Sequence, residues 1–325
     1  MGFLPGEVVA PGDPRVLLEG QWGMGPGVAT TVNSGSRISF GFAGTGVQVL
    51  FDTEGLTVAP HLWVRVDDGE PRLHLVEGPV LELSVEEGRH TVEIVVKDVN
   101  EFVNRWNPPF ECAVVFAGLV LDDRTSLRLG AQPGGPRIEF YGDSITQGVR
   151  ALSADPESAG ADGTRSWAYL TARAFGASAH QVGFGRQGVI KPGNGEVPPG
   201  PESFGWNFAG SRAERIADPD VVVLNLGVND DTLSVAQYAD YVRQVRAAYP
   251  SSKIVAVSPF SGKYAEEIEA AVKVVDDPAI AYVPTTDWIG PDDCTDGLHP
   301  SVDGHAKIAD RLIPALERLT GLTRR

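Results

Sequence analysis

The sequence predicts two domains of different fold class: an all-β sandwich of the jelly-roll type over residues 1–130, and an α/β/α domain with a parallel sheet over residues 131–325. Three observations lead to this prediction. Apolar and polar residues alternate in short runs through the first part of the chain. A Gly- and Pro-rich segment follows at residues 129–136, and beyond it continuous apolar runs alternate with helix-length stretches. The 325 residues give each part enough chain for a core of its own.

The runs of period two in the first part lie at residues 37–42, 47–51, 61–66 and 91–96. Turn-forming residues separate them at 67–70 and at 86–89. Several short strands at this spacing, with no helix-length pattern between them, are typical of a sandwich or jelly roll.

In the second part, buried strands are expected at residues 137–141, 178–182, 221–226, 253–258 and 280–283, and helices near 166–175, 234–248, 262–275 and 301–319. Strands that alternate with helices form a parallel sheet covered on both faces. Such sheets bind ligands at the carboxyl ends of their strands, so a functional site is expected in the loops that follow the strands.

The composition excludes several classes of function. A net charge of −16, without any cluster of Lys or Arg, argues against binding to nucleic acid or to anionic lipid. No apolar run reaches the length of about 18 residues that a membrane span needs. The amino terminus has no basic segment followed by an apolar one, so we expect a cytoplasmic location, or a secreted one if a signal peptide has been removed. Cys112 and Cys294 fall in different domains, so no disulfide is expected.

Two segments far apart in the sequence carry groups suited to nucleophilic catalysis. Gly142-Asp143-Ser144-Ile145-Thr146-Gln147-Gly148 places a serine on a tight turn directly after an apolar strand, and Asp296-Gly297-Leu298-His299-Pro300 supplies an acid and an imidazole before the last helix. A serine hydroxyl becomes a good nucleophile when a base takes its proton, and the base works best when a carboxylate fixes its tautomer. The sequence therefore predicts a catalytic triad of Ser144, His299 and Asp296.

His299 is preferred over the other five histidines because it alone has a carboxylate three residues earlier and a proline directly behind it. His61, His74 and His90 alternate with apolar residues, as solvated strand positions do. His305 lies on the last helix and is expected to be structural, whereas His180 stands at a strand end from which it could approach the site.

Two further loops follow predicted strands and are expected at the same edge of the sheet. One is the Gly-rich loop that contains Gly183, Gly185 and Gly188; the other ends in Gly227-Val228-Asn229-Asp230. Asn229 is a candidate site residue, although Asn is also a common turn former. Asp230 and Asp231 have no matching cluster of metal ligands elsewhere in the sequence, so we expect them to cap the following helix rather than to bind a metal.

With these four segments the chain resembles the SGNH (GDSL-type) hydrolase superfamily over roughly residues 137–320. The blocks of that family are a GDS nucleophile turn, a Gly after the second strand, a G-x-N-D after the third strand and a D-x-x-H near the carboxyl terminus. The resemblance implies an SGNH-type domain whose oxyanion hole consists of the backbone N–H of Ser144, the backbone N–H of Gly185 and the side-chain amide of Asn229. Gly183 and Gly188 stay alternatives to Gly185.

A sandwich in front of an SGNH domain also resembles the layout of carbohydrate esterase family 2 and of related bacterial acyl esterases and acyltransferases. The resemblance implies a serine esterase that hydrolyses small acyl esters, above all O-acetyl groups, on a small molecule or an oligosaccharide. No cofactor and no metal ion are expected, because the serine mechanism requires neither.

Two alternatives stay open. One is an acyltransferase that passes an acyl group, for example from acyl-CoA, to a hydroxyl of a sugar or natural product. The other is a carbohydrate-binding protein without activity, against which the complete triad argues.

Overall fold

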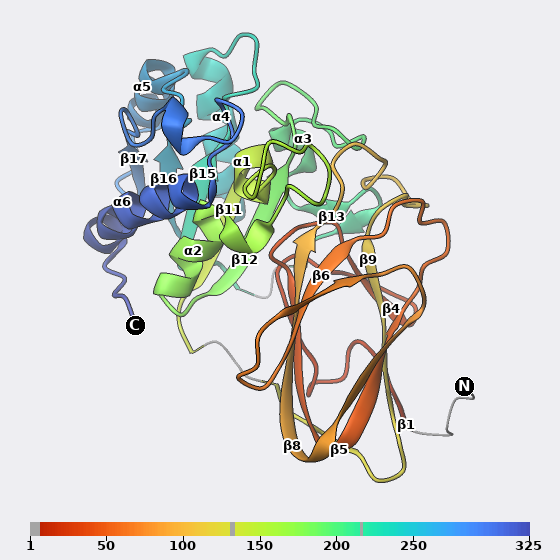
Figure 1. Ribbon diagram of the computed structural model, residues 1–325. Helices are drawn as coiled ribbons and strands as arrows, with labels where there is room; N and C mark the ends of the chain where they lie inside the picture. Colours follow the sequence, from red (N-terminus) through yellow and green to blue (C-terminus); the bar gives the residue numbers. More distant parts are fainter. Residues whose placement is uncertain (1–6, 131–133, 215–216) are drawn as a thin grey trace.

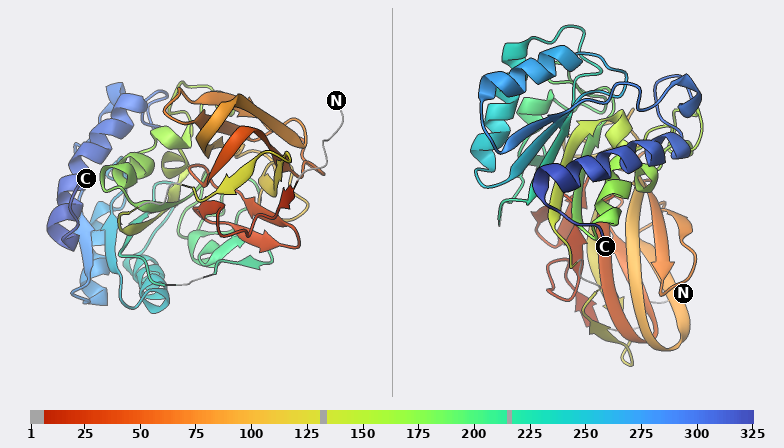
Figure 2. Two further views of the ribbon diagram at one scale, coloured as in Figure 1. Left: turned by 90° about the horizontal axis from the view of Figure 1, so that it is seen from below. Right: turned by 90° about the vertical axis from the view of Figure 1, so that its left-hand side faces the viewer.

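The computed structural model describes residues 7–130, 134–214 and 217–325 and arranges them in two lobes (Figure 1). The first lobe is built on an antiparallel sheet and the second on a parallel sheet with helices, which confirms the predicted fold class. The two lobes lie one above the other when the molecule is viewed from its side (Figure 2).

The first lobe is one antiparallel sheet that curls around an apolar core containing Phe40, Phe42, Val49 and Phe116. Its main strands follow the order β3-β4-β9-β5-β8-β6-β7, with β1 paired to β9 and with β2 and β10 paired to β5. The strands are β1 (Glu7–Val9), β2 (Leu17–Glu19), β3 (Gly23–Gly25), β4 (Val28–Thr31), β5 (Arg37–Phe51), β6 (His61–Val66), β7 (Arg72–Leu75), β8 (Val80–Asp98), β9 (Val114–Leu121) and β10 (Ser126–Arg128).

Two of the predicted strands, residues 37–42 and 47–51, form the single strand β5. The turn predicted at residues 86–89 is wrong too, because these residues continue β8 beside β5. The pairing between the two strands passes from Gly44 opposite Gly88 to Gly46 opposite Ser84, so the ladder is irregular at this point. The turn-like residues therefore lie in a β-bulge, which bends a strand without ending it.

The second lobe contains a five-stranded parallel sheet with the order β12-β11-β15-β16-β17. Its strands are β11 (Arg137–Asp143), β12 (Ser178–Phe184), β15 (Val221–Asn225), β16 (Lys253–Val257) and β17 (Ile280–Val283). The chain runs from β11 to its neighbour on one side and then returns to β15 on the other side, so the strand order reverses at β11. The carboxyl end of β11 is thus the topological switch point, where sheets of this kind bind ligands.

Helices cover both faces of the parallel sheet. Val222 and Leu224 of β15 face one layer with α4 and α5, whereas Val221 and Val223 face the other layer with α2 and α6. The helices are α1 (Ser144–Gln147), α2 (Trp167–Ala174), α3 (Gly200–Ser203), α4 (Val235–Ala248), α5 (Ala265–Val275) and α6 (Val302–Thr320), with 3-10 turns η1 (Gly163–Arg165) and η2 (Pro291–Asp293). In the described ranges, none of these helices has the length and apolar character needed to cross a bilayer.

All four helices predicted from periodicity, now α2, α4, α5 and α6, are present. Sequence reasoning missed α1, α3 and the small hairpin of β13 (Trp206–Phe208) and β14 (Ser211–Arg212). Each of these elements is too short to show a periodic pattern.

The two lobes share part of their apolar core. Trp106 and Ala113 of the first lobe belong to the same buried cluster as Phe184 and Phe204 of the second. The connecting segment, residues 129–136, includes residues 131–133, which lie outside the described ranges. We propose that the domain boundary falls in this segment, between residues 130 and 131.

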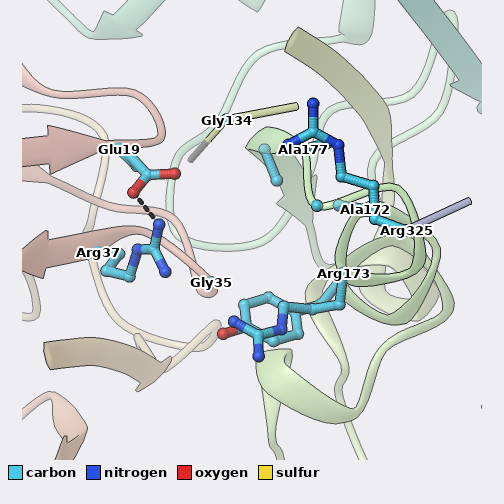
Figure 3. A pocket seen from close by; sticks show the side chains of 11 residues that line it. Glu19, Gly35, Arg37, Gly134, Ala172, Arg173, Ala177 and Arg325 are labelled. Carbon is cyan, nitrogen blue, oxygen red and sulfur yellow. Dashed lines mark hydrogen bonds and ion pairs between the residues drawn. The ribbon is translucent and has the colours of Figure 1, made fainter. Parts of the chain in front are cut away.

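A cavity of about 340 Å³ lies between the lobes at the amino ends of β11 and β12 (Figure 3). Arg37 on its wall forms an ion pair with Glu19, and Arg173 and Arg325 line it from the second lobe. Because Ser144 follows the opposite end of β11, the length of that strand separates this cavity from the predicted catalytic serine.

Candidate active site

The predicted nucleophile, Ser144, is the first residue of α1 and follows directly on the central strand β11. The preceding Asp143 caps this helix, because its Oδ1 accepts the backbone N–H of Ile145 at 2.9 Å. Position 142 has no room for a side chain, since a Cβ there would lie 2.0 Å from Oγ1 of Thr146. The turn holds Ser144 at the carboxyl edge of the sheet with 6% of its surface exposed.

The loop before α6 brings Asp296 and His299 together. Asp296 Oδ1 accepts the backbone N–H groups of Leu298 at 3.0 Å and of His299 at 2.8 Å, while its Oδ2 lies 2.8 Å from His299 Nδ1. Gly297 between them has a φ of +85°, in the left-handed region that suits glycine. One carboxylate therefore fixes both the backbone of the loop and the ring of the histidine.

His299 also reaches the serine. Its Nε2 lies 3.0 Å from Ser144 Oγ, and His299 is 9% exposed. The three residues predicted as a triad thus form one chain of hydrogen bonds from Asp296 through His299 to Ser144. A hydrogen bond from Nδ1–H to the carboxylate leaves Nε2 free to accept the hydroxyl proton, which is the arrangement of a serine nucleophile with its general base.

Arg150 completes this group, and sequence analysis missed it. Its guanidinium forms an ion pair with Oδ2 of Asp296. Partial burial acts to raise the pKa of the Asp296 carboxyl, but the hydrogen bonds from His299, Arg150 and the backbone N–H of Leu298 outweigh it and hold that pKa well below its usual range. Asp296 is therefore ionised at neutral pH. Nothing in the local sequence around Arg150 indicated this contact, which joins residues 146 positions apart.

The candidate oxyanion donors come from the strands on either side of β11. Gly185 is the first residue beyond β12, and Asn229 lies in the turn that follows β15. The backbone N–H of Gly185 donates to Gln147 Oε1 at 3.2 Å, and Asn229 Nδ2 donates to the backbone carbonyl of Gln187 at 3.1 Å. A side-chain amide carries two N–H hydrogens, so Asn229 keeps a second donor beyond this contact.

The other two glycines of the loop have packing reasons of their own. Gly183 lies inside β12 opposite Gly142, and a Cβ on it would come within 2.5 Å of the backbone nitrogen of Gln147. Gly188 packs against Asp230, whose Oδ1 would lie 2.2 Å from a Cβ at that position. Gly185 is the glycine that stands at the strand end itself.

The expected N-cap role of Asp230 is wrong. Ser234 caps α4, in a reciprocal capping box with Gln237. Asp230 is instead fully buried and accepts the backbone N–H groups of residues 189, 190 and 191 at 2.8 to 3.1 Å. These hydrogen bonds connect the Gly-rich loop to the turn that carries Asn229. The three converging N–H donors also satisfy the buried carboxylate.

The competing histidines lie outside the triad. His305 is fully buried on α6, and its Nδ1 accepts the backbone N–H of Trp167 at 3.1 Å, so its role is structural as expected. His180 lies in β12 opposite Glu139, near the amino end of that strand. Burial lowers the pKa of His180 to about 4. His61, His74 and His90 are only partly exposed, so they are less solvated than predicted.

Buried polar residues of the first lobe lie directly beneath the nucleophile helix, and they too were missed. Arg105 is fully buried and donates from Nη2 to Gln147 Oε1 at 2.8 Å. Gln147 Nε2 in turn donates to Asp98 Oδ1 at 3.1 Å. The only sequence signal was a group of polar residues over positions 97–107, which begins in the last two residues of β8. Its partners are remote in sequence, so no local pattern reveals them.

Within the described ranges, no group of three or more His, Cys, Asp or Glu side chains is arranged to hold a metal ion. The cysteines Cys112 and Cys294 are both free thiols. The candidate chemical groups at this site are the hydroxyl, imidazole and carboxylate of the predicted triad and the N–H donors around them.

Comparison with known proteins agrees with the fold and the order of these segments. Residues 140–307, just over half of the chain, match the profile of the GDSL-like Lipase/Acylhydrolase family. Among curated proteins, the cellulase/esterase CelE of Acetivibrio thermocellus is 24% identical over 95% of this chain. The chain spans only 40% of the length of that relative.

Solved structures share the whole two-lobed fold. A family two carbohydrate esterase from Cellvibrio japonicus superposes with a TM-score of 0.82 at 20% identity, covering 97% of this chain and 98% of the other. A family two carbohydrate esterase from Clostridium thermocellum in complex with cellohexaose gives 0.77 at 23% identity, covering 95% and 100%. The salicylyl-acyltransferase SsfX3 from a tetracycline biosynthetic pathway gives 0.66 at 18% identity, covering 98% and 99%. At these identities the likeness establishes the fold and not the substrate.

Proposed function

Since this chain belongs to the GDSL-like lipase/acylhydrolase family and is an SGNH-type esterase, we propose that it hydrolyses small acyl esters, chiefly O-acetyl esters of carbohydrates, through Ser144, His299 and Asp296. The observation that carries the proposal is the continuous chain of hydrogen bonds between these three side chains at the switch point of the sheet.

In the proposed mechanism, Ser144 Oγ attacks the acyl carbonyl carbon while His299 Nε2 takes the hydroxyl proton. Collapse of the tetrahedral intermediate breaks the bond to the alcohol oxygen, and His299 gives its proton to that oxygen. A water molecule then attacks the acyl-serine with His299 again as base, which releases the acid and restores the serine. Asp296 holds the ring and stabilises its cationic form throughout, because it remains ionised.

The negative oxygen of the intermediate needs N–H donors that are already in place. We assign this role to the backbone N–H groups of Ser144 and Gly185 and to the side-chain amide of Asn229. The second N–H hydrogen of Asn229 supports its assignment. For Gly185, the assignment requires that its N–H be shared between Gln147 Oε1 and the oxyanion, or pass from one to the other during the reaction.

Carbohydrate as the alcohol part of the substrate is supported by what the similar proteins are called. The curated relative carries both cellulase and esterase in its name, and one of the similar structures holds cellohexaose. The net charge of −16 agrees with a neutral partner such as a sugar better than with an anionic one.

Acyl transfer is the second candidate. The SsfX3 acyltransferase shows that this fold supports transfer in another protein. The observation on this chain that favours it is the low exposure of Ser144 and His299, since an acyl-enzyme must be shielded from water for transfer to compete.

The test of the proposed function is an assay of the purified protein with p-nitrophenyl acetate and with O-acetylated xylo-oligosaccharides. We expect release of acetate from both, unchanged by EDTA, because no step uses a metal ion. If the wild-type protein released acetate from neither ester, the proposal would be refuted. Loss of activity with EDTA would refute the metal-free mechanism.

A further inference from the structure

A carboxylate of the first lobe lies inside the candidate active site. Glu101 follows the end of β8 by three residues and is 8% exposed. Its Oε2 accepts a hydrogen bond from Asn194 Nδ2 at 3.3 Å. A Cβ added to Gly185 would lie 1.3 Å from this same oxygen, so the carboxylate rests against the α-carbon of the candidate oxyanion donor.

The Glu101 carboxylate interacts electrostatically with His299 and with Asp143, the residue directly before Ser144. Burial raises the pKa of Glu101, and the Arg105 guanidinium, the Asn194 hydrogen bond and the His299 imidazole oppose this rise. The charge of Glu101 also contributes to the raised pKa of Asp143, after burial itself and the nearby Asp230. Glu101 therefore shares its surroundings with the candidate base and the nucleophile turn, although it comes from the other domain.

One oxygen of this carboxylate is free to bind a ligand. Among the described residues, Oε1 of Glu101 has no hydrogen-bond partner. This oxygen is not fully buried, so it touches solvent. A nearly buried carboxylate with one solvent-facing oxygen beside a catalytic histidine can accept a hydrogen bond from a substrate hydroxyl.

The position of His299 indicates which part of the ester this hydroxyl belongs to. In the proposed mechanism His299 protonates the departing alcohol oxygen, so the alcohol part must lie beside the imidazole. Glu101 interacts with the same imidazole, and a negative charge there repels anionic alcohols and favours neutral, hydroxyl-rich ones.

We propose that Glu101 is a specificity-determining residue, which accepts a hydrogen bond from a free hydroxyl of the alcohol part and selects esters of neutral polyols such as sugars. This inference rests on the proposed esterase function and deepens it. It gives the first lobe a direct role in substrate recognition, in addition to its contacts beneath the nucleophile helix.

The experiment compares two acetate esters in the wild type and in Glu101→Gln. One is p-nitrophenyl acetate, whose leaving group has no hydroxyl besides the ester oxygen; the other is a mono-O-acetylated methyl xyloside with free neighbouring hydroxyls. Hydrogen bonds to a charged acceptor are stronger than those to a neutral amide, so we expect kcat/KM for the sugar ester to fall about tenfold. For p-nitrophenyl acetate we expect a change of less than about twofold.

The matched control is Glu111→Gln, which changes a carboxylate of the same loop that accepts the backbone N–H of Asn104. It should leave both rates unchanged. Asn194→Ala keeps the carboxyl group of Glu101 but removes its orienting hydrogen bond, and should lower only the sugar-ester rate. This variant decides the question if Glu101→Gln lacks a cooperative melting transition.

The possible results separate the two proposals. If the wild type hydrolyses neither ester, the esterase function fails, and the specificity role fails with it. If the wild type is active and Glu101→Gln lowers both rates equally, or lowers neither, the esterase function stands and the specificity role is overturned. Equal loss on both esters would instead mean that Glu101 acts on His299 or on the fold.

Discussion

Arg150 and His299 bind the same oxygen of one carboxylate, Oδ2 of Asp296. In the proposed mechanism His299 becomes cationic when Ser144 attacks, and its partner Asp296 then stabilises two positive charges. The guanidinium fixes the position of the carboxylate but also takes up part of its negative charge. Arg150 is therefore expected to act as a positioning residue whose two effects partly cancel.

We predict that Arg150→Ala lowers kcat about two- to tenfold and leaves KM nearly unchanged. The ion pair is only partly buried, with side-chain exposures of 29% and 16%, so its contribution is on the order of 1 kcal/mol. Arg150→Lys should restore most of the rate. Arg243→Ala, which removes an exposed pair with Asp240, serves as the control. An effect confined to KM would show that Arg150 binds substrate instead.

Ser144 and His299 should behave as one unit. We predict that Ser144→Ala and His299→Ala each reduce kcat/KM by ~10³-fold or more, because either change removes nucleophilic attack on the acyl carbon. The double variant should be no worse than the single ones. Steady-state kinetics on p-nitrophenyl acetate, with circular dichroism to check folding, would test this. Additive losses in the double variant would mean that the two side chains act in separate steps.

Asp296→Asn is predicted to be milder than His299→Ala by on the order of tenfold to a hundredfold. The asparagine oxygen can still accept the backbone N–H groups of Leu298 and His299, so the loop keeps its shape. Its amide nitrogen cannot accept from His299 Nδ1 and faces the guanidinium of Arg150. A variant as active as the wild type would remove Asp296 from the mechanism.

The buried carboxyl of Asp143 predicts a pH dependence of stability. Burial, assisted by the charges of Asp230 and Glu101, raises the pKa of Asp143 to about 7 in the folded protein. An ordinary aspartate in the unfolded chain titrates near pH 3.9. The folded state therefore holds one more proton between these values, so this group's contribution to stability falls as pH rises from about 4 to about 7. The full difference is on the order of 4 kcal/mol.

The test for Asp143 is urea unfolding of the wild type and Asp143→Asn at pH 4, 6 and 8. An asparagine cannot ionise, yet its oxygen can still accept the N–H of Ile145. The stability of the variant relative to the wild type should therefore increase with pH, since contributions from other groups cancel in the difference. A constant difference across this range would show that Asp143 does not bind a proton on folding.

The sequence predicts the parts of the structure that depend on neighbouring residues and misses those that depend on contacts between residues far apart in the chain. The period-two runs and the longer helices depend on neighbouring residues, so β6, α4 and α6 could be located from the pattern alone. The period-two pattern predicts two separate runs where the structure has the single strand β5, because the irregularity between Gly44 and Gly46 depends on pairing with the distant β8. Periodicity does not report such pairing.

The same difference between local and distant contacts applies to the residues of the candidate site. The GDS turn and the Asp-x-x-His loop are short local motifs, so the sequence alone identifies Ser144, Asp296 and His299 as candidates. Arg105, Gln147 and Glu101 make contacts between the two lobes, which no local motif encodes. Asp230 was assigned to a helix cap because capping is the local role of such a residue, while its actual partners lie about 40 positions earlier.

The last prediction concerns the choice between hydrolysis and transfer. An acyltransferase must shield its acyl-serine from water and hold the acceptor at a high effective concentration. The segment that borders Gly185, residues 191–200, is polar and rich in Gly and Pro. It packs against the first lobe through Arg105 N–H to the carbonyl of Gly195 and Asn107 Nδ2 to Glu196. A rim fixed in this way supplies no apolar cover, so we expect hydrolysis to dominate.

The experiment supplies p-nitrophenyl acetate or acetyl-CoA together with millimolar xylose or cellobiose and quantifies the products. Free acetate should exceed acetylated sugar with either donor; the reverse ratio would make this protein a transferase.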